Sequence, residues 1–377
     1  MNFGLTDEQE LIRRTVRDFA ESRVAPVAEE LDREARFPYE LVAELAELGL
    51  MGLPIPEEYG GAGGDTVSYA ITIEELTRID SSVAITVAAH TSLGTMPIYL
   101  FGSEEQKREW LPRLASGEGL AAFGLTEPDA GSDAGATRTK ASLIDGEWVI
   151  DGSKIFITNA GTDISACVTI TAVTGDGEIS NIIVPNGTAG YEISAPMKKL
   201  GWHASDTREL SFNGCRVPEG NLLGERGRGF RQFMKILDGG RISVASMGVG
   251  LAQGAYDLAL AYAKERRQFG KAIAEFQAIQ FQLADMATEI DAGRQLVYRA
   301  AWLKDQGRDF ALAAAQAELF TGILSNKVVN SALQIHGGYG FMEEFAISRL
   351  YRDQKILEIG EGTNEVQRMV IAKHLGL

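Results

Sequence analysis

A carboxylate flanked by two glycines stands near the end of the chain, where residues 359–368 read IGEGTNEVQR. Glycine carries no Cβ, so Glu361 can project from an unhindered backbone into a cleft and serve as a general base. Thr363 suits the start of a following helix, whose free N–H groups favour an anionic ligand. Taken by itself, however, the segment is better explained by a solvated carboxylate at a helix start.

Two further segments combine glycines with polar side chains. Residues 123–135 read FGLTEPDAGSDAG, which leaves backbone N–H groups and hydroxyls free to contact the carbonyls and phosphates of a ligand. Residues 334–344 read QIHGGYGFMEE and allow a ligand to approach the backbone closely. The plainer alternatives are a polar loop for the first segment and a cap between two helices for the second.

Several common enzyme signatures are missing. The chain has no phosphate loop, no dinucleotide-binding glycine pattern after a strand and no nucleophile elbow. Glycines 248, 250 and 254 are spaced for close packing between helices. The four histidines lack metal-ligand spacing, so we expect no metal. Cys167 and Cys215 are expected to be reduced packing residues.

The charge balance is acidic, with 36 Lys and Arg against 52 Asp and Glu and a formal net charge of −16. Nucleic acids and anionic membranes bind basic surfaces, so we expect neither a nucleic-acid partner nor membrane insertion. The first residues, MNFGLTDE, lack the basic and apolar regions of a secretion leader, and no apolar run approaches the length of a membrane span. We therefore expect a cytoplasmic protein.

Three regions follow one another along the chain. Residues 1–118 read as helices, beginning with a capping box formed by Thr6 and Gln9. Residues 119–229 read as strands, with hairpin turns expected at Asp145-Gly146 and at Asp151-Gly152. Because strands do not alternate with helices there, we expect an antiparallel barrel or sandwich. Residues 230–377 read as long helices joined by short turns, which predicts an antiparallel bundle.

Together these segments resemble the acyl-CoA dehydrogenase family over almost the whole chain. The strings LTEPDAGSD and QIHGGYGF match its two best-known signatures, and KIFITN, SDTR and ERRQFGK match in family order. The resemblance implies an α+β fold with an N-terminal helical domain (1–118), a middle antiparallel β-domain (119–229) and a C-terminal four-helix bundle (230–377).

The resemblance also assigns roles to individual residues. Glu361 corresponds to the catalytic base. Asp238, Arg241 and Gly362 correspond to substrate contacts, although Arg241 could instead form an ion pair on a helix surface. Ser132 stands where the loop meets the FAD pyrophosphate or the CoA chain. The remaining residues expected to bind FAD are Phe123, Leu125, Thr126, Phe156, Ile157, Thr158, Arg266, Gln268, Phe269, Phe276, Gln277, Gln334, Gly337, Gly338, Thr363 and Glu365.

The implied reaction is the α,β-dehydrogenation of an acyl-CoA thioester to a trans-2-enoyl-CoA, with electrons passed to an electron-transfer flavoprotein. Glu361 would remove the α-proton while flavin N5 takes the β-hydride. Some relatives carry the base just before the arginine matched by Arg241, where this chain has Gly240. In the family some FAD contacts come from a neighbouring subunit, which implies a homotetramer.

Departures from the family pattern concern the acyl pocket. Gly360 replaces a frequent tyrosine, Phe156 replaces a frequent tryptophan, and residues 200–204 are unusual. We expect short to medium straight acyl chains. Two other functions stay open on sequence grounds: an oxidase or monooxygenase on the same fold, and an acyl-CoA-binding protein without catalysis.

Overall fold

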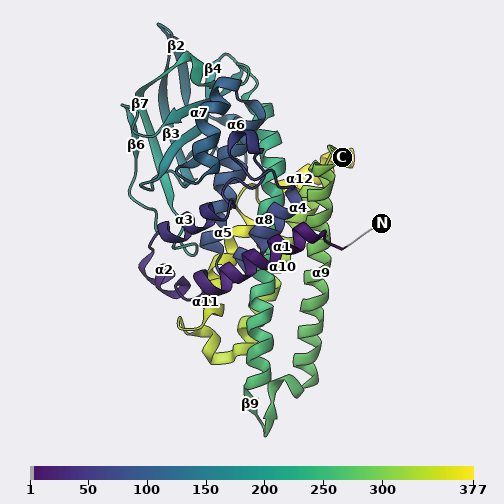
Figure 1. Cartoon of the computed structure of the whole chain (residues 1–377). Coiled ribbons are helices and arrows are strands. Elements are labelled where there is room, and N and C mark those ends of the chain that lie inside the picture. Colours follow the sequence, from purple (N-terminus) through teal and green to yellow (C-terminus); the bar gives the residue numbers. More distant parts are fainter. Residues whose placement is uncertain (1–3) are drawn as a thin grey trace.

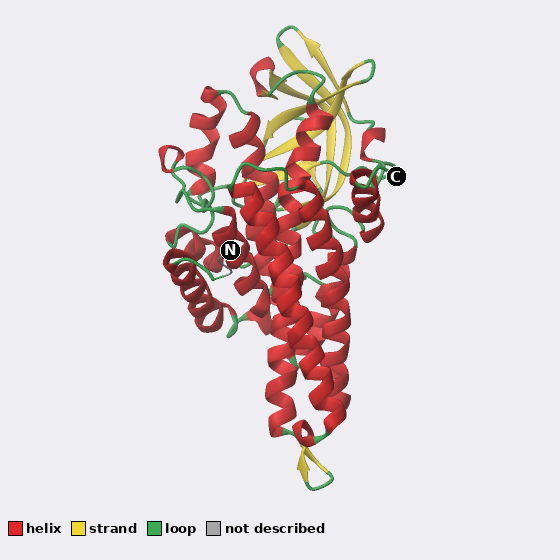
Figure 2. Ribbon diagram, turned by 90° about the vertical axis from the view of Figure 1, so that its right-hand side faces the viewer, coloured by secondary structure: helices red, strands yellow, loops and turns green. Residues whose placement is uncertain are grey.

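The computed structural model describes residues 4–377; residues 1–3, part of the stretch without a leader pattern, lie outside it. Helices occupy both ends of the chain, and a sheet lies between them in sequence and at one end of the molecule in space (Figures 1 and 2). The α+β class expected from the sequence is confirmed. The N-terminal helices are α1 (Asp7–Phe19), α2 (Ala28–Glu34), α3 (Tyr39–Glu47), α4 (Thr66–Ile79), α5 (Ser81–Ala88), α6 (Met96–Phe101) and α7 (Glu104–Ala115), with π-helical turns η1 (Ala20–Val24) and η3 (Ala89–Thr95).

The capping box predicted at the first helix is present. Thr6 is the N-cap of α1, its hydroxyl accepts from the Gln9 backbone N–H at 3.2 Å, and the Gln9 side chain accepts from the Thr6 backbone. Val16 and Phe19 of this helix are buried in the core.

The sheet has the strand order β6-β7-β3-β2-β4-β5-β8, with β1 paired to β4. Most neighbours are antiparallel, but β1 and β2 both run parallel to β4. The strands are β1 (Leu120–Gly124), β2 (Lys140–Ile144), β3 (Glu147–Thr158), β4 (Ser165–Gly175), β5 (Glu178–Pro185), β6 (Tyr191–Ile193), β7 (Thr207–Pro218) and β8 (Leu222–Leu223).

Of the two expected hairpin turns, only Asp145-Gly146 joins two strands, β2 and β3. The prediction for Asp151-Gly152 is wrong, because both residues lie inside β3. The register against β7 shifts between Ile150 and Gly152, which marks a bulge. Gly152 has φ +146°, and a Cβ there would lie 2.6 Å from the Thr139 hydroxyl. Gly152 is therefore needed because Thr139 lies too close for a side chain at position 152. The dipeptide alone does not distinguish a glycine of this kind from one in a hairpin turn.

The C-terminal region is built on three long helices, α8 (Gly229–Glu265), α9 (Gln277–Asp305) and α10 (Ala311–His336). A small hairpin, β9 (Arg267–Gln268) with β10 (Lys271–Ala272), lies at the tip of the bundle, at the end opposite the sheet (Figure 1). After α10 come η7 (Gly337–Phe341), α11 (Ala346–Asp353), η8 (Gln354–Glu358) and α12 (Asn364–His374).

Glycines on α8 let neighbouring helices approach closely. A Cβ on Gly248 would lie 2.8 Å from Thr321 of α10, and one on Gly254 would lie 2.1 Å from the carbonyl oxygen of Arg78 in α4. The interpretation of this glycine spacing as helix packing is confirmed.

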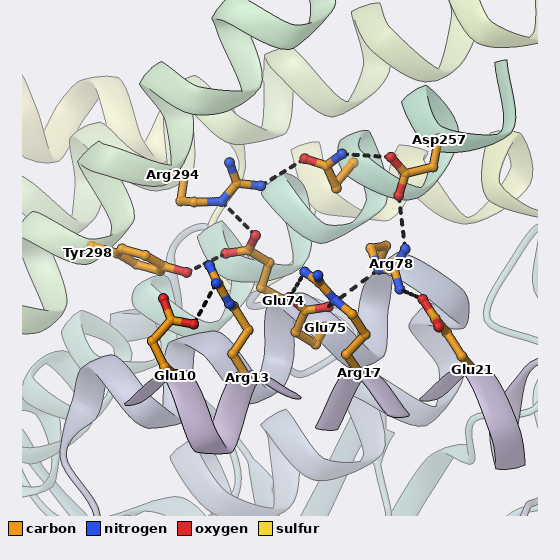
Figure 3. A network of polar contacts seen from close by, with 11 residues as sticks. Glu10, Arg13, Arg17, Glu21, Glu74, Glu75, Arg78, Asp257, Arg294 and Tyr298 are labelled. Carbon is orange, nitrogen blue, oxygen red and sulfur yellow. Dashed lines mark hydrogen bonds and ion pairs between the residues drawn. The ribbon is translucent and has the colours of Figure 1, made fainter. Parts of the chain in front are cut away.

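A network of charged side chains joins α4 to the bundle (Figure 3). Glu74 accepts from Arg294 Nε at 2.8 Å and from the Tyr298 hydroxyl at 3.0 Å, and Arg78 Nη1 donates to Asp257 at 3.0 Å. Burial raises the pKa of Glu74, although Arg294 opposes this shift. Because removing one partner would leave a buried charge, this network fixes the N-terminal helices on α8 and α9.

The helical run Ser81–Phe101 is long and apolar enough to cross a membrane, so the expectation that no run approaches this length is wrong. However, 78% of its most apolar stretch is buried inside the protein, as in a core helix.

His90, in the η3 part of this run, connects it to two neighbouring elements. Its Nδ1 accepts from the Ala121 N–H at 3.1 Å, while its Nε2 lies 3.0 Å from the Leu114 carbonyl oxygen. Burial lowers the pKa of His90 to about 4, so a neutral ring anchors η3 to β1 and α7.

Candidate active site

Glu361 lies in the short turn between η8 and α12. It has φ +55°, a left-handed conformation that is unusual for a residue with a side chain and is concentrated at functional sites. Thr363 is the N-cap of α12, as its position in the sequence predicted, and its hydroxyl accepts from the Val366 N–H at 3.3 Å. Glu361 therefore lies outside regular helix, two residues before the N-cap of α12.

The Glu361 carboxyl group lies against α8. A Cβ on Gly240 would come within 2.2 Å of its Oε2 and within 3.3 Å of Leu93 from η3. Oε2 is buried and has no hydrogen-bond partner within residues 4–377. A side chain at position 240 would thus point to the place that Glu361 occupies, which explains in physical terms how a base can come from either position.

The protonation of Glu361 is set by its surroundings. Burial raises its pKa to about 7, and Arg241 opposes the rise. A carboxylate with such a pKa is a stronger base than an ordinary glutamate, and about half of it is ionised at neutral pH. Glu361 is therefore equipped to remove a weakly acidic proton.

Arg241 and Asp238 form an ion pair three residues apart on α8. The pair is not on the surface, because Arg241 is only 1% exposed and its Nε is buried without a partner. Burial raises the pKa of Asp238, whereas Arg241 lowers it. Arg241 therefore has a free donor in the region of the base.

Polar side chains that the sequence reasoning missed lie beside Glu361. The Tyr69 hydroxyl donates to the Ala88 carbonyl at 3.1 Å, and Ser92 donates to the same oxygen at 2.7 Å. The Ser243 hydroxyl donates to the Gly240 carbonyl at 2.7 Å and lies 3.4 Å from the Ser92 hydroxyl. Burial raises the pKa of Tyr69, and the charge of Glu361 raises this pKa further. Hydrogen bonds with Ser243 and Ser92 act in the opposite direction and lower it. The sequence feature that could have indicated Tyr69 is its position between the small residues Ser68 and Ala70 of a buried helix.

The loop at 123–135 is held in place by a buried ion pair. Lys154 Nζ donates to Glu127 at 2.7 Å and to the Leu125 carbonyl at 3.3 Å, while Glu127 also accepts from the Thr139 N–H at 3.0 Å. Burial raises the pKa of Glu127, but hydrogen bonds from Lys154 and Thr137 outweigh it and hold the pKa at about 2. The Ile155 N–H donates to the Thr126 carbonyl at 2.9 Å. The loop therefore lies beside β3.

This arrangement brings one group of the expected FAD residues together. Phe123 and Leu125 pack in one cluster with Leu93, next to the base. Ile157 is buried on β3, whereas Phe156 has φ +63° and is 61% exposed. The hydroxyls of Thr126, Ser132 and Thr158 have no hydrogen-bond partner within residues 4–377. Thr126 and Thr158 directly follow Leu125 and Ile157 in the chain.

A second group lies at the tip of the bundle. A cavity of about 540 Å³ is lined by Arg266 and Gln268, which follow α8, and by Gly337 and Gly338, which follow α10. A Cβ on either glycine would meet nothing within 4 Å. Arg266 lies over the Tyr339 ring at 5.4 Å and forms no ion pair within residues 4–377. Phe269 on the hairpin is 93% exposed, and Phe276, Gln277 and Gln334 lie at the adjoining helix ends.

The two groups lie at opposite ends of α8, a helix of 37 residues and thus about 55 Å long (Figure 1). Free hydroxyls near the base suit the polar edge of a flavin, and an unpaired guanidinium above open glycines suits a pyrophosphate. The residues therefore fit FAD, but one chain does not bring both groups to one ligand. Thr363 and Gly362 border the base, whereas Glu365 is exposed and pairs with Arg368 at 3.1 Å.

Family models identify the protein. Those for the N-terminal, middle and C-terminal domains of acyl-CoA dehydrogenase match residues 6–118, 122–215 and 227–376. The chain belongs to the acyl-CoA dehydrogenase family. It is an oxidoreductase that dehydrogenates acyl-CoA thioesters, and its cofactor is FAD.

Individual relatives cover the full length of the chain. A probable acyl-CoA dehydrogenase of Bacillus subtilis is 53% identical over 100% of both chains. The structure of butyryl-CoA dehydrogenase from Megasphaera elsdenii matches with a TM-score of 0.97 and 43% identity, covering 100% of both chains. A chain in a structure of the electron transferring flavoprotein of Acidaminococcus fermentans matches with a TM-score of 0.97 and 44% identity, covering 100% of this chain and 99% of that one.

Proposed function

We propose that Glu361 is the catalytic base and that the substrates are short, straight-chain acyl-CoA thioesters. The observation that carries this proposal is the buried, unpaired Oε2 of Glu361, in a strained turn and against Gly240. The α-proton of a thioester is a very weak acid, so its pKa lies far above that of an ordinary glutamate. A base with a pKa of about 7 reduces this difference in pKa. Its location beside the expected flavin-side residues supports the same role.

The chain's own groups account for proton removal. Glu361 takes the α-proton on Oε2, and the enolate that forms needs donors at the thioester oxygen, for which the backbone N–H of Glu361 is our candidate. Bound FAD supplies the acceptor for the β-hydride. Leu93 and Gly240 keep bulk water from the carboxyl group, which preserves its raised pKa.

Acyl length is limited, in our proposal, by Tyr69. Tyr69 is 4% exposed, and its hydrogen bond to Ala88 fixes its hydroxyl close to Ser92 and Ser243. A rigid, buried tyrosine near the base leaves little room beyond the reacting carbons. The similarity to a butyryl-CoA dehydrogenase supports a short chain. Asp238 and Arg241 are proposed to contact the substrate near its CoA part.

The active unit is proposed to be a homotetramer in which each FAD is shared between subunits. The separation of the two groups of FAD residues along α8 supports this assembly. We propose domains at 1–118, 119–229 and 230–377, a cytoplasmic location and a role in acyl-chain oxidation. The likeness to a chain associated with an electron transferring flavoprotein supports such a flavoprotein as electron acceptor.

The test is Glu361→Gln in the purified holoenzyme. The variant is expected to retain FAD and bind butanoyl-CoA but to lose at least about 10³-fold in anaerobic flavin reduction, because the amide cannot accept the proton. Wild-type protein assayed with acyl-CoAs from about four to sixteen carbons would define the substrate range. A Glu361→Gln variant that still bleaches at a near-normal rate would refute the assignment of the base.

A further inference from the structure

A second carboxyl group is buried behind Glu361. Glu318, on α10, is 1% exposed, and both of its carboxyl oxygens are buried without a hydrogen-bond partner within the described residues. Buried carboxylates almost always have partners, because an unpaired charge away from water is very costly. Glu318 therefore calls for an explanation that the reaction described so far does not supply.

The charged groups around Glu318 do not favour a carboxylate. Arg241 is the cation that acts on it, but Arg241 already pairs with Asp238. Burial raises the pKa of Glu318 well above its ordinary value, and the charge of Glu361 raises it further, while Arg241 and the Gln367 amide lower it. The like charge of Glu361 thus adds to the effect of burial.

The neighbouring amide connects Glu318 to the turn of the base. Gln367 is fully buried on α12, and its Nε2 donates to the Gly362 carbonyl at 3.1 Å. A Cβ on Gly362 would lie 2.8 Å from the same Nε2, so the amide packs directly on the residue after Glu361. Its Oε1 is buried and has no partner within residues 4–377.

The unpaired oxygens of Glu318 and Gln367 indicate that Glu318 is protonated. A carboxylate only accepts hydrogen bonds, so it cannot satisfy the Oε1 of Gln367. A neutral carboxylic acid has both a donor and an acceptor, as a primary amide has, so the two groups can be complementary. One proton on Glu318 therefore supplies the donor that the Oε1 of Gln367 lacks.

We propose that Glu318 is kept as a neutral carboxylic acid that pairs with the Gln367 amide and thereby positions the turn that presents Glu361. Glu318 is a positioning residue, since it acts on the base through Gln367 and Gly362 and touches no reacting atom. Its neutral state also keeps a second negative charge away from Glu361, which must itself be ionised to work. This inference rests on the proposed role of Glu361 as the base.

The test compares Glu318→Gln with Glu318→Leu in the holoenzyme. An amide keeps both a donor and an acceptor, whereas leucine has a similar size and neither. We expect Glu318→Gln to have kcat within about twofold of wild type and an unshifted pH profile of kcat/KM, because no charge is removed. We expect Glu318→Leu to lower kcat by about tenfold or more with little change in KM, because the base is no longer held in position.

A second readout follows the base alone. Exchange of the α-hydrogen of a non-oxidisable acyl-CoA analogue with D2O, measured by mass spectrometry, should be slowed by Glu318→Leu and restored by Glu318→Gln. Flavin content and melting temperature report folding. If Glu318→Leu does not fold, the pH profile of Glu318→Gln still decides.

Two outcomes would overturn the proposal. A fall of the apparent pKa in the Glu318→Gln profile by more than about 0.5 would mean that Glu318 carries a charge that acts on the base. Normal exchange in a folded Glu318→Leu would mean that the turn needs no support from position 318. Failure of Glu361 as the base is distinguished by Glu361→Gln, which would then retain exchange.

Discussion

Adding one methyl group at position 240 should disable the base without harming the fold. In Gly240→Ala the new Cβ would lie 2.2 Å from Glu361 Oε2 and 3.3 Å from Leu93. Non-bonded atoms normally stay about 3.4 Å apart, so the carboxyl group must retreat by about 1.2 Å. Gly240 lies inside α8, and its backbone is held by the helix, so the Glu361 side chain is the part that moves.

The size of the effect follows from this displacement. A shift of about 1 Å in a reacting group can cost about a hundredfold in rate, which corresponds to about 2.7 kcal/mol in the barrier. Alanine is favoured over glycine in a helix by up to about 1 kcal/mol, so the variant should not be less stable by helix propensity. We therefore expect kcat to fall about a hundredfold while FAD content and melting temperature are kept.

The assay is stopped-flow flavin bleaching under nitrogen with butanoyl-CoA. Gly239→Ala is the matched control, because it is adjacent on the same helix and its Cβ would meet only Lys304 Nζ, at 3.5 Å. The control should bleach at nearly the wild-type rate. If Gly240→Ala bleached as fast as Gly239→Ala, Glu361 would not act from the position it occupies against α8.

Three further predictions follow from the site. Below pH 7, kcat/KM should fall about tenfold per pH unit, because Glu361 must be deprotonated and burial raises its pKa to about 7; a flat profile from about pH 5.5 to 8 would contradict this. Lys154→Met should lower the free energy of unfolding in urea by about 3 kcal/mol and loosen FAD, since Glu127 would stay buried without its cation, and adding Glu127→Gln should restore part of the loss. Tyr69→Ala should raise the ratio of kcat/KM for octanoyl-CoA to that for butanoyl-CoA by about tenfold or more; an unchanged ratio would show that Tyr69 does not limit the acyl chain.

The helices and most strands could be predicted from local sequence, because their determinants are local. The capping box at Thr6 and the turn at Asp145-Gly146 each follow from a few adjacent residues. Asp151-Gly152 carries the same dipeptide, yet Gly152 allows a close approach by Thr139, which lies just before β2. A contact between two segments of the chain cannot be predicted from the residues next to either of them.

The candidate site shows the same division. The glycines around Glu361 indicated a projecting carboxylate, and the resemblance to a family supplied its role. Neither indicated that Gly240 is required by the Glu361 carboxyl group, or that Tyr69 lies beside the base. Glu318 was overlooked because a glutamate in an alanine-rich helix normally faces water.

The charged network of Figure 3 also bears on how the chain is made. Glu74 meets partners that follow it by 220 and 224 residues, and Asp305 accepts from the Thr66 N–H 239 residues earlier. A ribosome synthesises the N-terminal helices long before these partners emerge. Their apolar faces and the Glu74 carboxyl group must wait for α9, whereas Glu75 pairs with Arg17 from the same N-terminal region, so the nascent chain is exposed to aggregation for most of its synthesis. Chaperone binding to α4 during translation would cover that interval.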